Sequence, residues 1–164
     1  MNRKATTFPT VSMSDVPESS KEPYRPVVLV VDDETVLADS LTEILRRSGY
    51  AAISVYDGEA ALEAALVTPP EMLISDVVLP GMTGIELAVT LKRIFPDCKV
   101  ILSSGHSHIK RQLTPDDCGG EQFVFLAKPV HPRELLERVA QAFRGHGIPV
   151  GTAAFQVTPN SSLA

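Results

Sequence analysis

The sequence predicts an α/β domain in which helices flank a five-stranded parallel sheet, and three observations lead to this fold class. Five short apolar runs alternate with stretches of helical periodicity, which is the pattern of repeated βα units. Gly, Pro or Asp residues bound these runs, as expected of short strands. The runs are nearly continuous in apolar residues, which is typical of parallel strands buried on both faces. The predicted strands comprise residues 27–31, 51–56, 72–76, 99–103 and 122–127.

The first predicted strand, Val27–Val31, is rich in β-branched residues and is followed by acidic residues at 32–34. From Thr35 the apolar residues recur at helical spacing, and Gly49 follows where a left-handed residue would end the helix. The face expected to point inward comprises Val36, Leu37, Leu41, Ile44 and Leu45. We therefore expect a buried strand followed by an amphipathic helix.

The middle of the chain repeats this alternation. Asp57-Gly58 leads from the second strand into an Ala-rich helix near residues 59–66, which Pro69-Pro70 stops. The third strand ends at Asp76 and breaks at once into a Pro-Gly loop. A helix then starts after Gly84, and its expected inward residues are Ile85, Ala88, Leu91 and Phe95.

The last third of the chain has a less regular beginning. Residues 106–113 are expected to form a short helix and residues 114–120 a loop. The final helix is predicted over Pro132–Phe143, and its expected core residues are Leu135, Leu136, Val139, Ala140 and Phe143.

The composition of the chain indicates where the folded domain begins and ends and argues against several classes of protein. Residues 1–25 and 146–164 lack apolar periodicity and are expected to be flexible arms around one domain at 26–145. The net charge of −5 argues against a general binder of nucleic acid or of an anionic membrane. No apolar run approaches the roughly 20 residues that span a bilayer, and the basic start lacks the apolar segment of a secretory signal. Cys98 and Cys118 lie far apart, which suits a reduced, cytoplasmic protein.

Polar residues follow several strands at the carboxyl end, where open α/β sheets bind their ligands. If the strand order is 2-1-3-4-5, the winding reverses between the strands that end at Asp32-Asp33 and at Asp76. Ser104 and Lys128, after the next two strands, would then flank the same crevice. Taken alone, an Asp more often starts a turn and a Lys is more often a solvated surface residue. Their coincidence at one sheet edge is what indicates a site.

The residue types favour phosphoryl chemistry with a hard metal ion. Three close carboxylates repel one another, and Mg2+ suits a site of carboxylates, a backbone carbonyl and water. The ligands that zinc prefers are missing nearby, and alternate residues such as His106 and His108 do not share a helix face. A carboxylate beside Mg2+ can attack phosphorus, while an ammonium and a hydroxyl neutralise the phosphoryl oxygens.

The chain resembles the receiver domains of two-component response regulators, including the single-domain chemotaxis regulators. The matching motifs agree in order and spacing over about residues 27–144. They are Val31-Asp32-Asp33-Glu34, Asp76 with Leu79-Pro80-Gly81-Met82 and Gly84, Ser104-Gly105, and Lys128-Pro129. The resemblance implies a flavodoxin-like, doubly wound sheet of order 2-1-3-4-5. Residues 106–121 depart from the family, because they lack its clear fourth helix.

The resemblance also implies a role for each site residue. Asp76 would accept the phosphoryl group, and the Mg2+ ligands would be Asp33 and Asp76 directly, Asp32 through water, and the backbone carbonyl of Val78. Ser104 would be the switch hydroxyl, Lys128 would bind the phosphate, and both would form these hydrogen bonds only with the phosphate. Phe125 matches the aromatic residue whose rotamer reports phosphorylation. Val78 and His106 match the positions that tune the lifetime of the phosphoryl group.

The function implied is that of a single-domain response regulator in a phosphorelay. A sensor histidine kinase or a histidine phosphotransfer protein would supply the phosphoryl group, and a downstream protein, which the sequence does not identify, would bind the switched surface. The protein would not be an enzyme, although it would assist its own phosphorylation and dephosphorylation. No direct contact with nucleic acid or membrane is expected.

Two other function classes fit parts of the pattern. A Mg2+-dependent phosphatase of the haloacid-dehalogenase type also forms an aspartyl phosphate, but its second acid would stand where this chain has Val78. An interaction module that works without phosphorylation is the other alternative, since a complete site can persist unused.

Overall fold

The structure is a computed structural model that describes residues 23–105 and 118–144. Its five strands form one parallel sheet in the order β2-β1-β3-β4-β5, which confirms the predicted fold class and strand order. The strands are β1 (Val27–Val31), β2 (Ala51–Val55), β3 (Met72–Asp76), β4 (Lys99–Ser104) and β5 (Val124–Ala127). The helices of the described residues are α1 (Thr35–Arg47), α2 (Gly58–Val67), α3 (Gly84–Ile94) and α5 (Pro132–Phe143).

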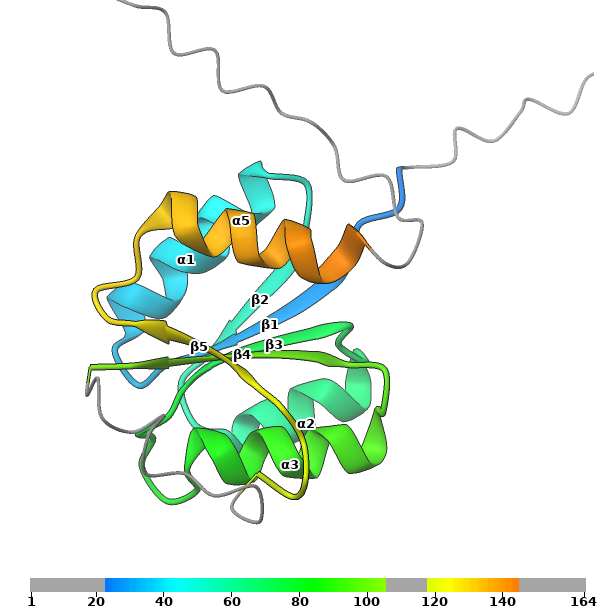
Figure 1. Ribbon diagram of the computed structural model, residues 1–164, viewed down its shortest axis with the longest axis vertical. Helices are drawn as coiled ribbons and strands as arrows, with labels where there is room; N and C mark the ends of the chain where they lie inside the picture. The colour runs from blue at the N-terminus through cyan, green and yellow to red at the C-terminus, as the bar shows by residue number, and fades with distance from the viewer. Residues whose placement is uncertain (1–22, 106–117, 145–164) are drawn as a thin grey trace, which may run out of the picture.

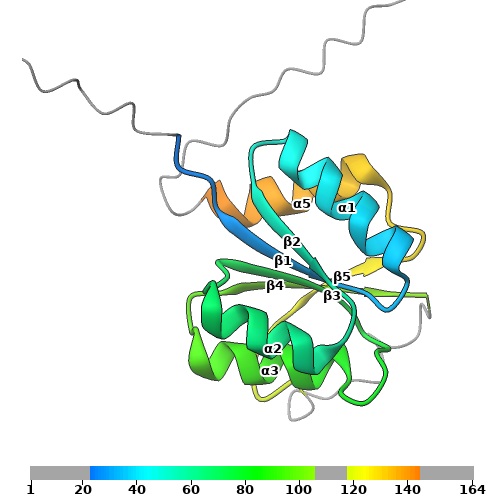
Figure 2. The same cartoon turned by 180° about the vertical axis from the view of Figure 1, so that it is seen from behind.

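Helices cover both faces of the sheet. Helices α1 and α5 lie on one face and α2 and α3 on the other, as Figures 1 and 2 show from opposite sides. Alternate residues of β1 therefore enter different cores: Val28 and Val30 pack in the cluster with α1 and α5. Leu29 and Val31 pack in the cluster with α2 and α3. Burial on both faces is the physical reason why this strand is apolar at every position.

The helix boundaries follow local signals. Gly49 has a φ of 95°, the left-handed conformation predicted for the residue after α1. Val36 was predicted to belong to the buried apolar face of that helix, and this prediction is wrong because Val36 is 79% exposed. It lies in the first turn of α1, whereas Leu41 and Leu45 further along the helix are buried against the sheet.

The carboxyl-terminal part differs from the prediction mainly at β5. This strand begins at Val124, because its pairing with β4 starts at Val124 opposite Ile101 and leaves Gln122 outside the ladder. Helix α5 spans Pro132–Phe143 as predicted. The short helix predicted at 106–113 and most of the loop predicted at 114–120 lie outside the described residues. No helix in the described part of the chain is long and apolar enough to cross a membrane.

Candidate functional site

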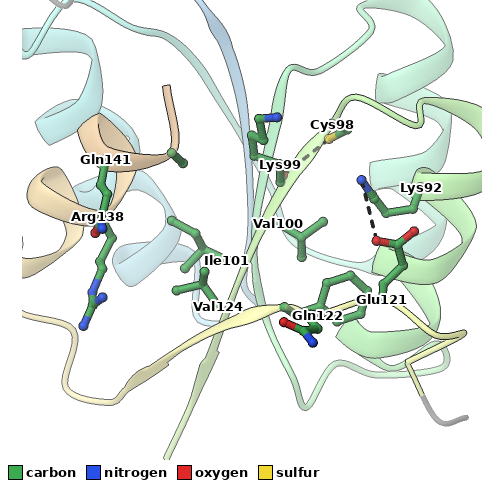
Figure 3. Close-up of a pocket in the computed structure, with 12 residues that line it drawn as sticks. Lys92, Cys98, Lys99, Val100, Ile101, Glu121, Gln122, Val124, Arg138 and Gln141 are labelled. Carbon is green, nitrogen blue, oxygen red and sulfur yellow. Dashed lines mark hydrogen bonds and ion pairs between the residues drawn. The ribbon is translucent and has the colours of Figure 1, made fainter. Parts of the chain in front are cut away.

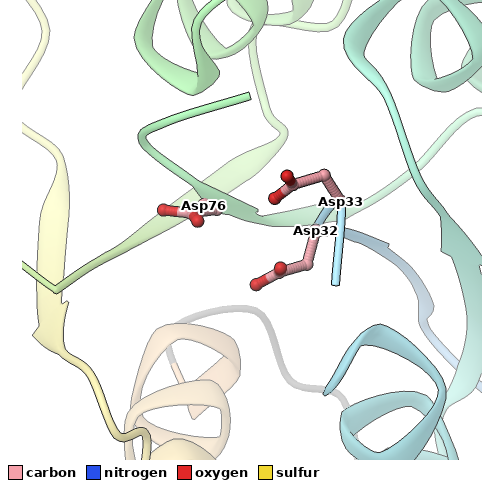
Figure 4. A group of neighbouring side chains, drawn as sticks. All are labelled: Asp32, Asp33 and Asp76. Carbon is pink, nitrogen blue, oxygen red and sulfur yellow. The ribbon is translucent and has the colours of Figure 1, made fainter. Parts of the chain in front are cut away.

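Three carboxylates meet at the carboxyl end of the sheet. Strands β1 and β3 are neighbours, with Val31 opposite Ser75, so the residues that follow, Asp32 and Asp76, come together. One carboxylate oxygen of each of Asp32, Asp33 and Asp76 lies within 4.8 Å of the others, and Figure 4 shows the three side chains near the ends of two neighbouring strands. Asp32 and Asp76 are buried, whereas Asp33 is exposed. We call this group the acidic cluster.

Lys128 joins the acidic cluster from β5, although β4 lies between β5 and β3. Its Nζ lies 2.8 Å from Oδ2 of Asp32 and 2.7 Å from Oδ2 of Asp76. Burial alone would lower the pKa of the Lys128 ammonium, but the hydrogen bonds and negative charges of both carboxylates outweigh burial and raise it. Lys128 is therefore a cation that holds two buried carboxylates together.

This geometry corrects one expectation about Lys128. The resemblance implied that its hydrogen bonds form only with a phosphate, yet the ammonium already bridges Asp32 and Asp76. Like charges on two buried carboxylates repel, so a cation between them lowers their electrostatic energy. If Asp76 carried a phosphoryl group, Lys128 would replace existing contacts with carboxylate oxygens by contacts with phosphoryl oxygens, and not all of its hydrogen bonds would be new.

Backbone N–H groups hold the other oxygens of the two buried carboxylates. Oδ1 of Asp32 accepts a hydrogen bond from the N–H of Glu34 at 3.0 Å. Oδ1 of Asp76 accepts one from the N–H of Val78 at 3.2 Å. Each carboxylate thus lies between Lys128 on one oxygen and the backbone two residues further on, which fixes its orientation.

The loop after Asp76 turns back tightly enough for α3 to touch the strand. Gly81 has a φ of 78°, which a side chain rarely adopts. The N–H of Gly84 donates to the carbonyl oxygen of Val77 at 2.9 Å. A Cβ on residue 84 would lie 1.8 Å from the carbonyl oxygen of Asp76, so glycine is required at this contact.

A capping box starts α3 at this position. The Thr83 hydroxyl accepts a hydrogen bond from the N–H of Glu86 at 3.2 Å, and the Glu86 carboxylate accepts one from the N–H of Thr83 at 2.8 Å. This role of Thr83 and Glu86 was not among the predictions from the sequence. The signal was present, since Thr-x-x-Glu before an apolar helical pattern is the signature of a capping box.

The structure describes three of the remaining predicted site residues, which differ in burial and in the element that carries them. Ser104 is the last residue of β4 and is 6% exposed. Its carbonyl oxygen accepts a hydrogen bond of 2.9 Å from the N–H of Lys128. Phe125 on β5 is partly buried and packs against the core formed with α2 and α3. Val78 lies two residues after Asp76 and is 59% exposed. His106, the other predicted lifetime residue, and His108 lie outside the described residues.

The acidic cluster has the donor set and charge for a small divalent cation. Three carboxylates and one ammonium leave two negative charges, which one divalent ion would balance. Carboxylate oxygen is a hard ligand, and no His or Cys joins the cluster among the described residues. This donor set suits Mg2+ and does not suit zinc.

Comparisons with known proteins agree with this arrangement. Residues 28–140 match the family profile of the response regulator receiver domain. The chain is 31% identical over 121 residues to a probable transcriptional regulatory protein, TcrX, from Mycobacterium tuberculosis. That match covers 74% of this chain and 51% of TcrX, so the chain spans about half the length of that relative.

Solved structures show the same fold. The response regulator TrrA from Thermotoga maritima, solved in complex with Mg2+ and BeF, is 29% identical with a TM-score of 0.62. The match covers 71% of this chain and 98% of TrrA. A CheY-like receiver domain protein from Methanospirillum hungatei is 27% identical with a TM-score of 0.65, covering 72% of this chain and 93% of that one.

Proposed function

The chain belongs to the family of response regulator receiver domains, and from this premise we propose that Asp76 accepts a phosphoryl group in a Mg2+-dependent reaction. Receiver domains are phosphoacceptor switches of two-component systems. The donor we propose is a sensor histidine kinase or a histidine phosphotransfer protein. The product is a receiver whose altered surface binds a downstream protein or whose phosphoryl group passes along a relay.

One observation carries the proposal: the buried Asp76 carboxylate faces the Lys128 ammonium at 2.7 Å beside two further carboxylates. A carboxylate that served only as a turn or helix cap would not need a cation from a strand two positions away in the sheet. The arrangement suits a nucleophile that must also tolerate an incoming, negatively charged phosphoryl group.

In the proposed step, an oxygen of Asp76 attacks the phosphorus of the donor. The new phosphorus–oxygen bond forms while the phosphorus–nitrogen bond of the donor phosphohistidine breaks, and the bonding pair leaves with the imidazole nitrogen. Lys128 would follow the transferred charge, since its ammonium can contact a phosphoryl oxygen while it keeps its bond to Asp32. Ser104, at the end of the intervening strand β4, would supply a hydroxyl to the same phosphoryl group.

We propose that Mg2+ binds Asp33 and Asp76 directly, Asp32 through water, and the backbone carbonyl of Val78. When bound, the ion would neutralise charge on the phosphoryl oxygens and on the acidic cluster. Asp33 is the exposed member of the cluster and so offers the entry side for a hydrated ion.

The switch would run through β4 and β5. Ser104 and Lys128 lie at the ends of these strands, and the N–H of Lys128 bonds to the carbonyl of Ser104. Phe125 lies three residues before Lys128 on β5, so a movement of β5 toward the phosphoryl group would shift its packing. We propose that this coupling changes the surface that a partner recognises, and that Val78 and His106 set how long the state lasts.

The test is phosphorylation with acetyl phosphate, followed by intact mass spectrometry. We expect the wild type to gain one phosphoryl group only when Mg2+ is present. Asp76→Asn should gain none, and Asp97→Asn, an exposed residue after α3, should behave like the wild type. Labelling of Asp76→Asn, or no labelling of the wild type by either acetyl phosphate or a histidine donor, would refute the proposal.

A further inference from the structure

Helix α2 exposes most of its large apolar side chains. Leu66 is 67% exposed and Val67 is 84% exposed, and both lie in the last turn of the helix. The residues that α2 buries are small, namely Gly58, Ala61 and Ala65. Packing within the described part of the chain therefore does not account for Leu66 and Val67, and adjoining exposed apolar side chains are typical of a binding surface.

Ile94 at the end of α3 extends this apolar surface. Helices α2 and α3 lie side by side on one face of the sheet (Figures 1 and 2). Lys92 of α3 faces away from α2, because its ammonium lies 3.9 Å from the carboxylate of Glu121, in the segment that leads into β5 (Figure 3). Ile94 comes two residues later, about 200° around the helix, and so lies on the side toward α2. It is 46% exposed.

The ends of the two helices share a hollow. Pro69, two residues after Val67, and Ile94 both line this hollow and are both exposed. Its volume is about 350 Å3, which is enough to take a large side chain of another molecule. We call Leu66, Val67, Pro69 and Ile94 the apolar patch.

Two carboxylates continue the outer face of α2. Glu63, Leu66 and Val67 follow Glu59 by four, seven and eight residues, which places all four on one face of the helix. Glu59 and Glu63 are exposed, and α2 contains no Lys or Arg. The outer face of α2 is therefore an acidic stripe that ends in the apolar patch.

The carboxylates of this stripe differ from exposed carboxylates on the other helices. Glu137 on α5 lies 3.0 Å from Arg133, and Glu43 on α1 is likewise paired with an arginine. Within the described ranges, no basic group forms an ion pair with Glu59 or Glu63. Unpaired carboxylates beside apolar side chains are complementary to a partner that carries positive charge beside apolar residues.

We propose that the acidic stripe and the apolar patch dock a basic amphipathic helix of a partner protein. The large apolar side chains of that helix cover the apolar patch, and its Lys or Arg side chains pair with Glu59 and Glu63. A helix laid along α2 repeats its side chains at the same spacing as the stripe. The apolar patch lies at the end of α2 that leads into β3, away from the acidic cluster, so docking does not require phosphorylation of Asp76.

The probe for this surface is a fluorescein-labelled synthetic helix of leucine and lysine, whose binding is measured by fluorescence anisotropy with Mg2+ present. We expect saturable binding of one probe per chain. Leu66→Gln should weaken it about tenfold, the effect of removing one well-covered apolar side chain. Val36→Gln changes another exposed apolar residue, on α1, and should alter the affinity by less than about twofold.

A second pair of variants tests the charge. Glu63→Gln should weaken binding about threefold, as loss of an exposed ion pair predicts. Glu137→Gln removes the same charge from α5, so a general attraction to a chain of net charge −5 would weaken equally in both variants. A matched helix of leucine and glutamate should show no saturable binding.

A further measurement places the probe without relying on any variant. Addition of the leucine–lysine helix to the isotope-labelled wild type should shift the backbone amide resonances of Glu63, Leu66 and Ile94 most strongly. Sedimentation without the probe should show a monomer. The proposal is overturned by unsaturable binding, by equal effects within either pair of variants, by equal binding of the leucine–glutamate helix, or by shifts centred elsewhere, such as on the acidic cluster. Self-association without the probe that buries the apolar patch would overturn it too, because the occupant would then be a second copy.

Discussion

Lys128 Nζ lies 2.7 Å from Oδ2 of Asp76, and the same nitrogen lies 2.8 Å from Oδ2 of Asp32, so a single ammonium that follows β5 bridges two buried carboxylates on the far side of β4. The structure thus has a cation at the place where the transferred phosphoryl group would arrive. Replacement of this cation by an apolar side chain of similar length tests how much the acidic cluster depends on it.

Lys128→Met is expected to lower the free energy of unfolding in the absence of metal, because Asp32 and Asp76 are left facing each other unpaired. Addition of Mg2+ should restore more stability to this variant than it adds to the wild type. Lys92→Met, which removes a lysine outside the acidic cluster, should show no enhanced response to Mg2+. Urea denaturation with EDTA and with Mg2+ measures both effects.

The difference in free energy of unfolding between the wild type and Lys128→Met should depend on pH in one direction. The Asp32 and Asp76 contacts raise the pKa of Lys128 above its ordinary 10.5. The contribution of the ammonium is therefore complete below pH 10.5 and is lost as the pH rises through the higher folded value. The stability difference between wild type and Lys128→Met should persist through neutral pH, and its disappearance near pH 8 would contradict this account.

Gly84→Ala is expected to destabilise the domain by about 1–3 kcal/mol, the cost of overpacking a tight contact. The added Cβ would lie 1.8 Å from the Asp76 carbonyl oxygen, so α3 or the end of β3 must shift. Gly105→Ala is the matched control, because a Cβ there meets no atom within 4 Å. Equal midpoints of urea unfolding for the two variants would show that the structure accommodates a Cβ next to the Asp76 carbonyl oxygen without loss of stability.

Mg2+ should stabilise the protein against unfolding, by about 2.7 kcal/mol at a free concentration of a hundred times its Kd. Asp33→Asn should remove most of this gain, since it deletes the exposed carboxylate of the acidic cluster. Glu63→Gln removes one exposed carboxylate from α2, outside the cluster, and should keep the full gain. Thermal unfolding at several Mg2+ concentrations distinguishes a bound ion from general charge screening, which would affect both variants alike.

The phosphoryl group on Asp76 is expected to have a long lifetime for a receiver. Val78 has no side-chain group that could hold the hydrolytic water in line, and it lies exposed two residues after Asp76, the last residue of β3. Val78→Asn should therefore shorten the lifetime, and a well-placed water can change the rate by up to about 100-fold. Val36→Asn makes the same change at another exposed valine and should leave the decay unaltered. Phosphate release from the phosphorylated proteins in Mg2+ measures the rates.

Tyr24 is expected to mark the edge of the folded unit on the amino-terminal side. Its hydroxyl donates to the carboxylate of Glu71, whose other oxygen accepts the N–H of Val27 at 3.1 Å. Removal of residues 1–22 and 149–164 should leave the melting temperature within a few degrees, whereas Tyr24→Phe in the shortened protein should lower the free energy of unfolding by up to about 1 kcal/mol.

The Tyr24 comparison belongs at neutral pH. The hydrogen bond to Glu71 raises the pKa of Tyr24 from 10.0 to about 12. Its contribution is complete below pH 10 and is lost as the pH rises through about 12. A large drop in melting temperature after removal of residues 1–22 would contradict the placement of the folded edge at Tyr24.

Local signals along the chain were sufficient to predict the α/β class and the helix ends, whereas the strand order was predicted from the resemblance to receiver domains. Gly49 follows the end of α1 and Pro132 begins α5, and both positions reflect backbone preferences that need no tertiary contact. Strand β1 is apolar throughout because a parallel strand is buried on both faces. The convergence of Asp32, Asp33 and Asp76 also followed from order alone, since the carboxyl ends of neighbouring parallel strands meet.

Distances across the sheet, in contrast, depend on how the strands are staggered and twisted, and no local pattern contains them. The bridge from Lys128 to two carboxylates and the approach of Gly84 to the Asp76 carbonyl are contacts between residues on different elements. Likewise, β5 joins β4 only at Val124, which the pattern of residues from 122 onward did not reveal. Periodicity reports which way a side chain faces, whereas packing decides what it meets there.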